Sequence, residues 1–272
     1  VLKEFNFLPS WRVDDVMVSY APVGGTVAPH YDYYDVFLIQ GEGSRRWQVG
    51  QVCDGDSDYD PSAPIKIVND FVPKMDVILA PGDVLYVPAK HAHYGVSLAS
   101  SVTYSVGFRA PSIRDIVDGV ATEVLSYLHD DQRYVDTAKS LQAAAGEIPQ
   151  SAIDQVTSML AESLLNKAVI ADWLGKSVTE PKYPELTSLE PGFLCDDTDD
   201  NVVYKDPASR FAYRVVSAES ELCHLFVNGE RYNCSVGLAK YLCVANPLEL
   251  GRLMMLEQSI DKDVLQMFVD VD

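Results

Sequence analysis

The sequence predicts a mainly β core followed by helices and a small mixed α+β segment. Three observations support this order. Residues 11–110 contain short β-type runs separated by Gly, Pro and Asp clusters. At Ser112 the apolar spacing changes to that of a helix. After a Pro-rich stretch at 180–192, strand patterns flank an Asn-Gly pair and helical patterns follow. We expect domains at 1–111, 112–180 and 193–272.

The predicted strands of the core follow one another at short intervals. Each is a short apolar or β-branched run that ends at turn residues. They cover residues 15–20, 35–40, 46–49, 66–68, 76–79, 83–87 and 102–108. Many short strands at this spacing favour a sandwich or a barrel.

Three helices are predicted in the middle of the chain. The first begins after Ser112, whose hydroxyl can cap it, and the second begins at Ser151. The third covers about 168–174 and is expected to end before Gly175. Helices appended to a β core often form a dimer interface, and packing within one chain is the alternative.

The C-terminal segment contains a predicted hairpin and two helical patterns. Strands at 211–216 and 224–227 precede Asn228-Gly229, a favoured two-residue hairpin turn. Helical patterns follow at 237–244 and 248–256. The segment resembles a winged helix, but it is net acidic and has no basic recognition face, so we interpret it as a protein-contact module.

Composition and charge exclude several classes. The 272 residues are 47% apolar with a formal net charge of −19, which excludes a disordered, collagen-like or coiled-coil chain. An acidic balance of this size argues against nucleic-acid binding, which needs clustered Lys and Arg. Residues 112–199 hold 16 acidic against 6 basic side chains. This middle region suits a basic protein partner.

The chain shows no signal for a membrane or an oxidising compartment. No apolar run reaches the roughly 20 residues that span a bilayer, and no leader pattern begins the chain. The five cysteines have no CxxC spacing, which favours reduced thiols. We therefore expect a cytoplasmic protein. Because the first residue is Val1, we also expect a fragment that lacks an N-terminal part.

The histidines of the β-rich part point to a metal site. His30 and Asp32 are two positions apart, so on a strand they share a face about 7 Å apart along the chain. Two histidines and one carboxylate form the facial triad of non-haem Fe(II) oxygenases. His91 and His93 compete for the third position, since both can face the same way in an extended segment.

Two sequence blocks resemble the paired motifs of the cupin superfamily. Residues 24–32 contain Gly, five residues, then His-x-Asp, without the family's following Glu. Residues 82–93 contain Gly, five residues, Pro, and a His five positions further on, with Lys90 in place of the second Gly. The two blocks stand in the expected order, with 62 residues between the two histidines. This motif offset selects His93 over His91.

A closer resemblance is to the JmjC-type 2-oxoglutarate oxygenases, and among them to the bacterial ribosomal oxygenases. The segments that carry it are 29–41, 43–47, 88–95 and 104–111. The resemblance implies a double-stranded β-helix core, a helical dimerisation region at 112–180 and a winged-helix-like C-terminal domain. It implies that His30, Asp32 and His93 bind Fe(II) and that 2-oxoglutarate is the co-substrate.

The resemblance also implies residues for the co-substrate. Arg45 lies 15 residues after His30, where the family has the Lys or Arg that binds the distal carboxylate of 2-oxoglutarate. A guanidinium fork can donate two parallel hydrogen bonds to a carboxylate. Arg46 is the adjacent competitor and faces the other side of the strand. Thr103 and Ser105 are candidates to donate hydroxyl hydrogen bonds to the co-substrate.

The implied reaction is hydroxylation of a ribosomal protein. Bacterial members of the family hydroxylate an arginine of a large-subunit protein, the sixteenth in bacterial naming, whereas eukaryotic relatives hydroxylate histidines. The expected partners are this substrate and a second copy of the chain. The alternatives are a non-catalytic cupin-like binding module and a metal-dependent cupin isomerase or dioxygenase that uses no 2-oxoglutarate.

Overall fold

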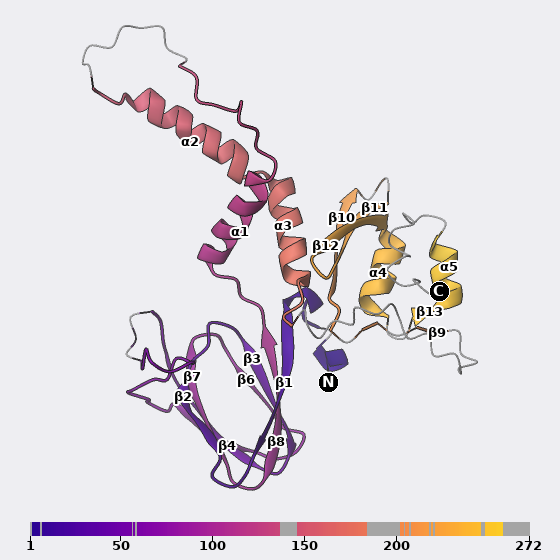
Figure 1. Cartoon of the computed structure of the whole chain (residues 1–272). Helices are drawn as coiled ribbons and strands as arrows, with labels where there is room; N and C mark the ends of the chain where they lie inside the picture. Colours follow the sequence, from indigo (N-terminus) through magenta and orange to yellow (C-terminus); the bar gives the residue numbers. More distant parts are fainter. Residues whose placement is uncertain are drawn as a thin grey trace. The chain divides into compact units, whose positions relative to one another are not determined.

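The chain forms two compact units, Val1–Ala110 and Pro111–Asp272, in a computed structural model (Figure 1). The structure describes residues 2–5, 7–55, 57, 59–136, 146–183, 202–203, 205–206, 208–217, 219, 221–245 and 248–257. The sequence predicted a helical region and a C-terminal domain as separate parts, and both lie within the second unit.

The first unit contains two four-stranded antiparallel sheets. After two short 3-10 helices, Leu2–Phe5 and Ser10–Arg12, the chain forms β1 (Val13–Ala21), β2 (Thr26–His30), β3 (Val36–Glu42), β4 (Arg45–Val52), β5 (Met75–Leu79), β6 (Val84–Val87), β7 (His91–Ser97) and β8 (Ser101–Phe108). One sheet has the order β1-β8-β3-β6 and the other β2-β7-β4-β5. The prediction of a mainly β core is confirmed.

Two details of the predicted strands differ from the structure. The expectation that His30 and Asp32 share one strand is wrong: β2, which was not among the predicted strand ranges, ends at His30, and Asp32 lies in the loop beyond it. Pro29 lies within β2, and proline is rare inside sheets. Residues 66–68 were predicted as a strand but form only isolated bridges, which join His30 to Ile67 and Tyr59 to Val68. This segment therefore lies beside the end of β2.

The core of the first unit lies between the two sheets. Side chains alternate along β4, so that Arg45, Trp47 and Val49 are buried while Arg46 is exposed. Trp47 and Val49 pack against Leu38 of β3, which belongs to the other sheet. The inward residues of both sheets thus form the walls of one interior.

The second unit begins with three helices, α1 (Ile113–Leu125), α2 (Gln150–Leu164) and α3 (Lys167–Thr179). Ser112 and Asp115 form a capping box at the start of α1, as the predicted cap requires. The prediction that the third helix ends before Gly175 is wrong. Gly175 lies inside α3, where a Cβ would approach the Phe226 ring to 2.3 Å. The glycine therefore permits close packing against the next strands.

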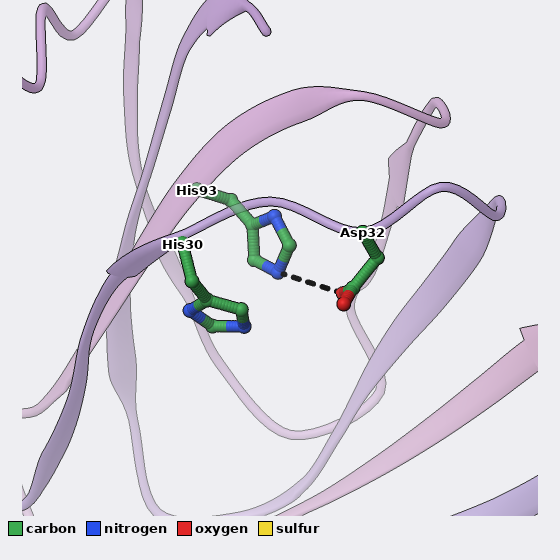
Figure 2. Close-up of side chains that lie close together, drawn as sticks. All are labelled: His30, Asp32 and His93. Atoms are coloured by element: carbon green, nitrogen blue, oxygen red, sulfur yellow. Dashed lines mark ion pairs between the residues drawn. The ribbon is translucent and has the colours of Figure 1, made fainter. Parts of the chain in front are cut away.

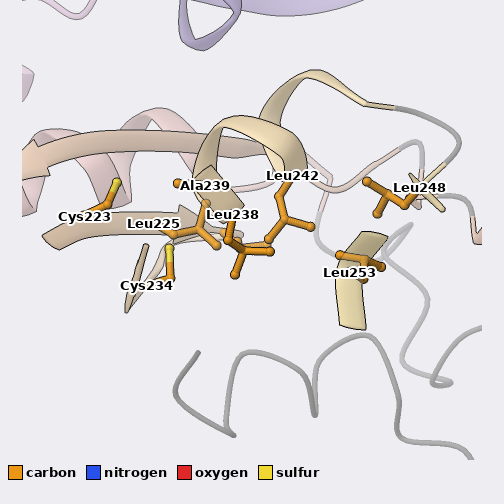
Figure 3. Packing of buried hydrophobic residues seen from close by; sticks show 9 residues of the cluster. Cys223, Leu225, Cys234, Leu238, Ala239, Leu242, Leu248 and Leu253 are labelled. Carbon is orange, nitrogen blue, oxygen red and sulfur yellow. The ribbon is translucent and has the colours of Figure 1, made fainter. Parts of the chain in front are cut away.

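The C-terminal part forms β9 (Val202–Val203), β10 (Phe211–Ser217), β11 (Leu222–Val227), β12 (Glu230–Ser235), α4 (Val236–Val244), β13 (Leu248–Glu249) and α5 (Leu250–Glu257). Asn228 and Gly229 have φ of 50° and 88°, which confirms the predicted two-residue turn. Leucines of α4 pack on Cys223, Leu225 and Cys234 of the hairpin (Figure 3).

The predictions for the linker, the cysteines and a membrane span can be compared with the structure only where residues are described. Most of the predicted linker, 184–192, lies outside them. Four cysteines are described and all are free thiols, three of them buried, as expected; Cys195 lies outside the described residues. Within the described residues, the helices are too short or too polar to cross a bilayer.

Candidate metal centre

His30, Asp32 and His93 converge in the first unit (Figure 2). His30 ends β2, Asp32 follows it in the β2–β3 loop, and His93 lies on β7. The register of β2 and β7 sets His30 directly opposite His93, and their ring centroids are 4.3 Å apart. The candidate ligand atoms of all three residues lie within 4.8 Å of one another. A single small cation can therefore contact all three.

Backbone carbonyls orient both imidazole rings. His30 Nδ1 lies 2.8 Å from the Ala28 carbonyl oxygen, and His93 Nδ1 lies 3.0 Å from the His91 carbonyl oxygen. A carbonyl oxygen only accepts hydrogen bonds, so each Nδ1 must carry the proton. Each Nε2 then keeps a free lone pair, which is the arrangement seen for histidine ligands of metals.

Burial keeps His93 in the form that binds metals. The side chain is 4% exposed. Burial lowers the pKa of His93, and the neighbouring His30 lowers it further. Its Nε2 lies 3.8 Å from Asp32 Oδ2, too far for a hydrogen bond. Two imidazole nitrogens and one carboxylate oxygen form the donor set of an Fe(II) facial triad, so the residues present fit such an ion.

His91 is separate from this group, although it shares a strand and a side-chain parity with His93. Its Nδ1 contacts the Ala89 carbonyl oxygen at 3.2 Å, and it pairs with Val52 of β4. Among the described residues, only His30, Asp32 and His93 meet as three potential ligands.

Arg45 is buried in the same interior with three serine partners. It is 8% exposed, and its guanidinium donates to the hydroxyls of Ser97, Ser19 and Ser101 at 3.3, 3.5 and 3.4 Å. Burial lowers the pKa of the guanidinium. No carboxylate among the described residues forms an ion pair with it. A buried cation without a counter-charge is costly, so a ligand carboxylate would stabilise it.

Arg46 lies on the other face of β4. It is exposed and binds the carboxylate of Asp76 with two nitrogens, one of them Nε at 2.7 Å from Oδ1. This pair raises the pKa of Arg46 and lowers that of Asp76. Arg46 therefore already has a carboxylate partner on the outer face of its sheet.

A cavity of about 430 Å³ joins the triad to Arg45. It is lined from both sheets by Asp15, Met17, Ser19, Tyr20, Ala21, Pro22, Gly25, Thr26, Val27, His30, Asp32, Tyr34, Val36, Leu38, Arg45, Trp47, His93, Gly95, Ser105 and Gly107. Arg45 pairs with Ser97 on β7, four residues from His93, which is about 13 Å along the strand. The space between them can hold a short dicarboxylate.

The two hydroxyl candidates on β8 differ in position. Ser105 lines the cavity. Thr103 is fully buried and is not among the lining residues; its hydroxyl donates to Gln40 Oε1 at 3.2 Å. Ser105 is therefore the candidate with direct access to a ligand.

The sequence interpretation missed Asp15 and Ser19 as cavity residues, whereas Tyr34 was among the tyrosines near the two metal blocks that it considered for a substrate groove. Asp15 and Ser19 share the inward face of β1 by the two-residue period, so this period is the signal that could have identified them. Asp15 and Tyr34 meet above Gly107: a Cβ there would lie 3.6 Å from Asp15 Oδ1 and 3.7 Å from the Tyr34 ring. A carboxylate and an aromatic ring thus share one part of the cavity.

Comparison with known proteins agrees with this geometry. Residues 1–116 match the JmjC domain family. The chain is 32% identical over 243 residues to a protein named probable ribosomal oxygenase from Haemophilus influenzae, and covers 58% of it. It is 33% identical over 198 residues to ribosomal protein uL16 3-hydroxylase from Escherichia coli, and covers 53% of it. These matches use 84% and 72% of the chain, which thus spans little more than half of each relative.

The chain is also similar to solved structures of a ribosomal oxygenase. The X-ray structure of Escherichia coli YcfD superposes with a TM-score of 0.79 at 27% identity, over 98% of this chain and 71% of that one. A structure of the same ribosomal oxygenase in complex with cobalt and 2-oxoglutarate has a TM-score of 0.69 at 26% identity, over 94% of this chain and 70% of that one.

Proposed function

We propose that the chain belongs to the JmjC-domain ribosomal oxygenases and that it is an Fe(II)- and 2-oxoglutarate-dependent oxygenase; its similarity to the JmjC family over residues 1–116 and to ribosomal oxygenases supports this. The proposed substrate is an arginine side chain of the large-subunit ribosomal protein that is the sixteenth in bacterial naming. One observation carries the proposal: a single cavity contains a three-ligand cluster and a buried guanidinium that no described carboxylate neutralises. This substrate also supports a cytoplasmic location.

The residues of the site have two roles, metal binding and co-substrate binding. His30 and His93 would bind Fe(II) through Nε2, and Asp32 through a carboxylate oxygen. When bound, Fe(II) with 2-oxoglutarate and dioxygen supplies the oxidation of an unactivated C–H bond. Arg45 would pair with the distal carboxylate of the co-substrate, and its three serine contacts hold the guanidinium in place. Ser105 is the hydroxyl donor in reach of the ligand.

Asp15 and Tyr34 favour an arginine target over a histidine. A guanidinium remains charged at any pH of interest and pairs well with a carboxylate, while its planar face stacks on an aromatic ring. Both partners converge above Gly107 in the cavity. A neutral imidazole could donate one hydrogen bond to the carboxylate but would bring no opposite charge. Histidyl hydroxylation therefore stands as the second candidate.

The direct test supplies purified natural protein with Fe(II), 2-oxoglutarate, and matched peptides of the ribosomal protein that carry either the arginine or a histidine. We expect succinate release and a gain of one oxygen, about 16 Da, on the arginine peptide. Oxidation of the histidine peptide alone would favour the alternative target. Metal binding without succinate release would favour a non-catalytic module, and turnover without 2-oxoglutarate would favour another type of cupin enzyme.

Asp15→Asn is expected to weaken binding of the arginine peptide. Loss of a hydrogen-bonded charge is worth about 1.5–3 kcal/mol, or roughly tenfold to a hundredfold in kcat/KM for the peptide. The KM for 2-oxoglutarate should stay the same. Asp14→Asn is the matched control, because Asp14 is adjacent on β1 but pairs with Arg109 at 3.1 Å outside the cavity lining. An equal effect of both changes would remove Asp15 from the proposal.

We also propose that the helices form a homodimer. In α2 no described side chain is buried, and Ile153, Val156 and Leu160 are 49, 45 and 55% exposed on one face. Uncovered apolar side chains at helical spacing suit a second copy of the same helix. The three-stranded sheet and α4 of the C-terminal part support a winged-helix-like protein-contact module.

Leu160→Glu is expected to convert the dimer into a monomer, because it places a charge in an apolar contact. Light scattering after gel filtration measures the mass directly. Ser158→Glu is the control, since Ser158 is exposed on α2 and its hydroxyl bonds only to the Asp154 carbonyl among the described residues. A monomeric wild type, or a dimer that survives Leu160→Glu, would contradict this interface.

A further inference from the structure

Strand pairing places His30 and His93 opposite each other, but it does not place Asp32. Asp32 lies beyond the end of β2, in the loop 31–35 that leads to β3. His93 follows the turn 88–90 between β6 and β7. Because Asp32 is outside any strand ladder, its distance from His93 depends on contacts between the loop and the turn.

Asp35 makes the first of these contacts with its side chain. Its Oδ1 accepts hydrogen bonds from the Tyr86 hydroxyl at 2.8 Å and from the Ala89 amide at 3.2 Å. Its Oδ2 lies 3.6 Å from a guanidinium nitrogen of Arg12. The hydrogen bond to Asp35 also raises the pKa of the Tyr86 hydroxyl. One carboxylate therefore connects the end of the loop to the turn.

Lys90 makes the second contact with its backbone. Its amide donates to the Asp32 carbonyl oxygen at 2.6 Å, and its own carbonyl accepts from the Cys53 amide at 2.8 Å. Its φ of 66° is unusual for a residue with a Cβ. Such a conformation persists only where surrounding contacts impose it. Two hydrogen bonds hold this turn: the Lys90 amide donates to the Asp32 carbonyl oxygen, and the Ala89 amide donates to the Asp35 carboxylate.

We propose that Asp35 is a positioning residue of the metal centre, which holds the turn 88–90 so that the Lys90 amide fixes Asp32 beside His93. The inference rests on the proposed function, because it assigns a role toward the Fe(II) site. Asp35 does not belong to the ligand cluster itself. It acts through Ala89 and Lys90.

The test measures Co(II) affinity by titration of the ligand-field absorption, which also reports the geometry around the ion. Asp35→Ala is expected to weaken Co(II) binding by about tenfold or more, the usual cost of losing an outer-shell partner. Its absorption bands should also shift. Asp35→Asn should bind Co(II) nearly as the wild type does, because an amide oxygen can accept the same two hydrogen bonds.

Asp83→Ala is the matched control. Its carboxylate also caps a turn, accepting the Ala80 amide at 2.8 Å between β5 and β6, but it touches neither the loop 31–35 nor the turn 88–90 in the described contacts. It should lower thermal stability without changing Co(II) affinity. Tyr86→Phe removes one hydrogen bond to Asp35 at an exposed position and should weaken Co(II) binding a few-fold.

The outcomes separate the inference from the proposed function. Unchanged Co(II) affinity and absorption in Asp35→Ala, or an equal loss in Asp83→Ala, would overturn the positioning role. If Asp35→Ala fails to fold, Tyr86→Phe decides, and wild-type affinity in that variant overturns the role. A wild type that binds no Co(II) contradicts the metal centre itself.

Discussion

Replacement of His93 by alanine, and separately of His30 by alanine, is expected to abolish turnover. Each change removes one of three ligand atoms that lie within 4.8 Å of one another, and two ligands rarely retain an ion at a site that needs three. The catalytic contribution of a metal ion is several kcal/mol, so the rate should fall by a factor on the order of 10³ or more. Succinate release with the arginine peptide measures the rate, and Co(II) titration measures loss of the ion.

His91→Ala is the control for this prediction. His91 lies two positions before His93 on β7 and its ring contacts the Ala89 carbonyl rather than the cluster. We expect full turnover, since the His91 carbonyl that orients His93 belongs to the backbone and is retained. An inactive His91→Ala beside an active His93→Ala would assign the third ligand to His91.

The choice between these histidines shows what residue spacing can and cannot predict. Both have the same parity on one strand, so the two-residue period places them on the same face. The structure separates them through the pairing of β2 with β7, where His30 is opposite His93. That register joins residues 63 positions apart, and no local pattern encodes it. Only the family motif offset selected His93.

For the strands and helices too, local sequence signals predict local features but not long-range contacts. Strong local signals, such as the Ser112 cap and the Asn228-Gly229 turn, were predicted at the correct residues. Gly175 was misinterpreted as a helix end because a glycine signals a stop locally. Its actual role is to admit the Phe226 ring, a contact made with a strand about 50 residues away in sequence. Tertiary packing overrides propensity in such cases.

The arrangement around Arg45 was predicted only in part. Alternation along β4 predicted that Arg45 and Arg46 face opposite sides, and the structure confirms this. The serines that contact Arg45 come from β1, β7 and β8, which the sequence does not bring together by any spacing rule. Proximity of polar groups from three strands follows from the packing of the two sheets around one interior.

Arg45→Ala is expected to raise the KM for 2-oxoglutarate by about tenfold to a hundredfold, because a charged hydrogen-bonded pair contributes roughly 1.5–3 kcal/mol. At saturating 2-oxoglutarate much of kcat should return, since the triad is intact. Without ligand, the variant should unfold at a temperature no lower than the wild type, because a buried cation with no carboxylate partner among the described residues is costly to the fold. The increase in Tm that 2-oxoglutarate gives the metal-loaded wild type should be lost.

Arg46→Ala tests whether the effect belongs to the inward face. Arg46 has the same side chain one position further on, but it is exposed and bound to Asp76. Its loss should leave the KM for 2-oxoglutarate unchanged, because an exposed pair contributes little. Arg45→Lys should give an intermediate KM, since an ammonium keeps the charge but cannot donate the same fork. If Arg45→Ala left the KM unchanged, the co-substrate carboxylate would have to bind elsewhere, and the buried guanidinium would have a structural role through the three serines and the Trp47 ring.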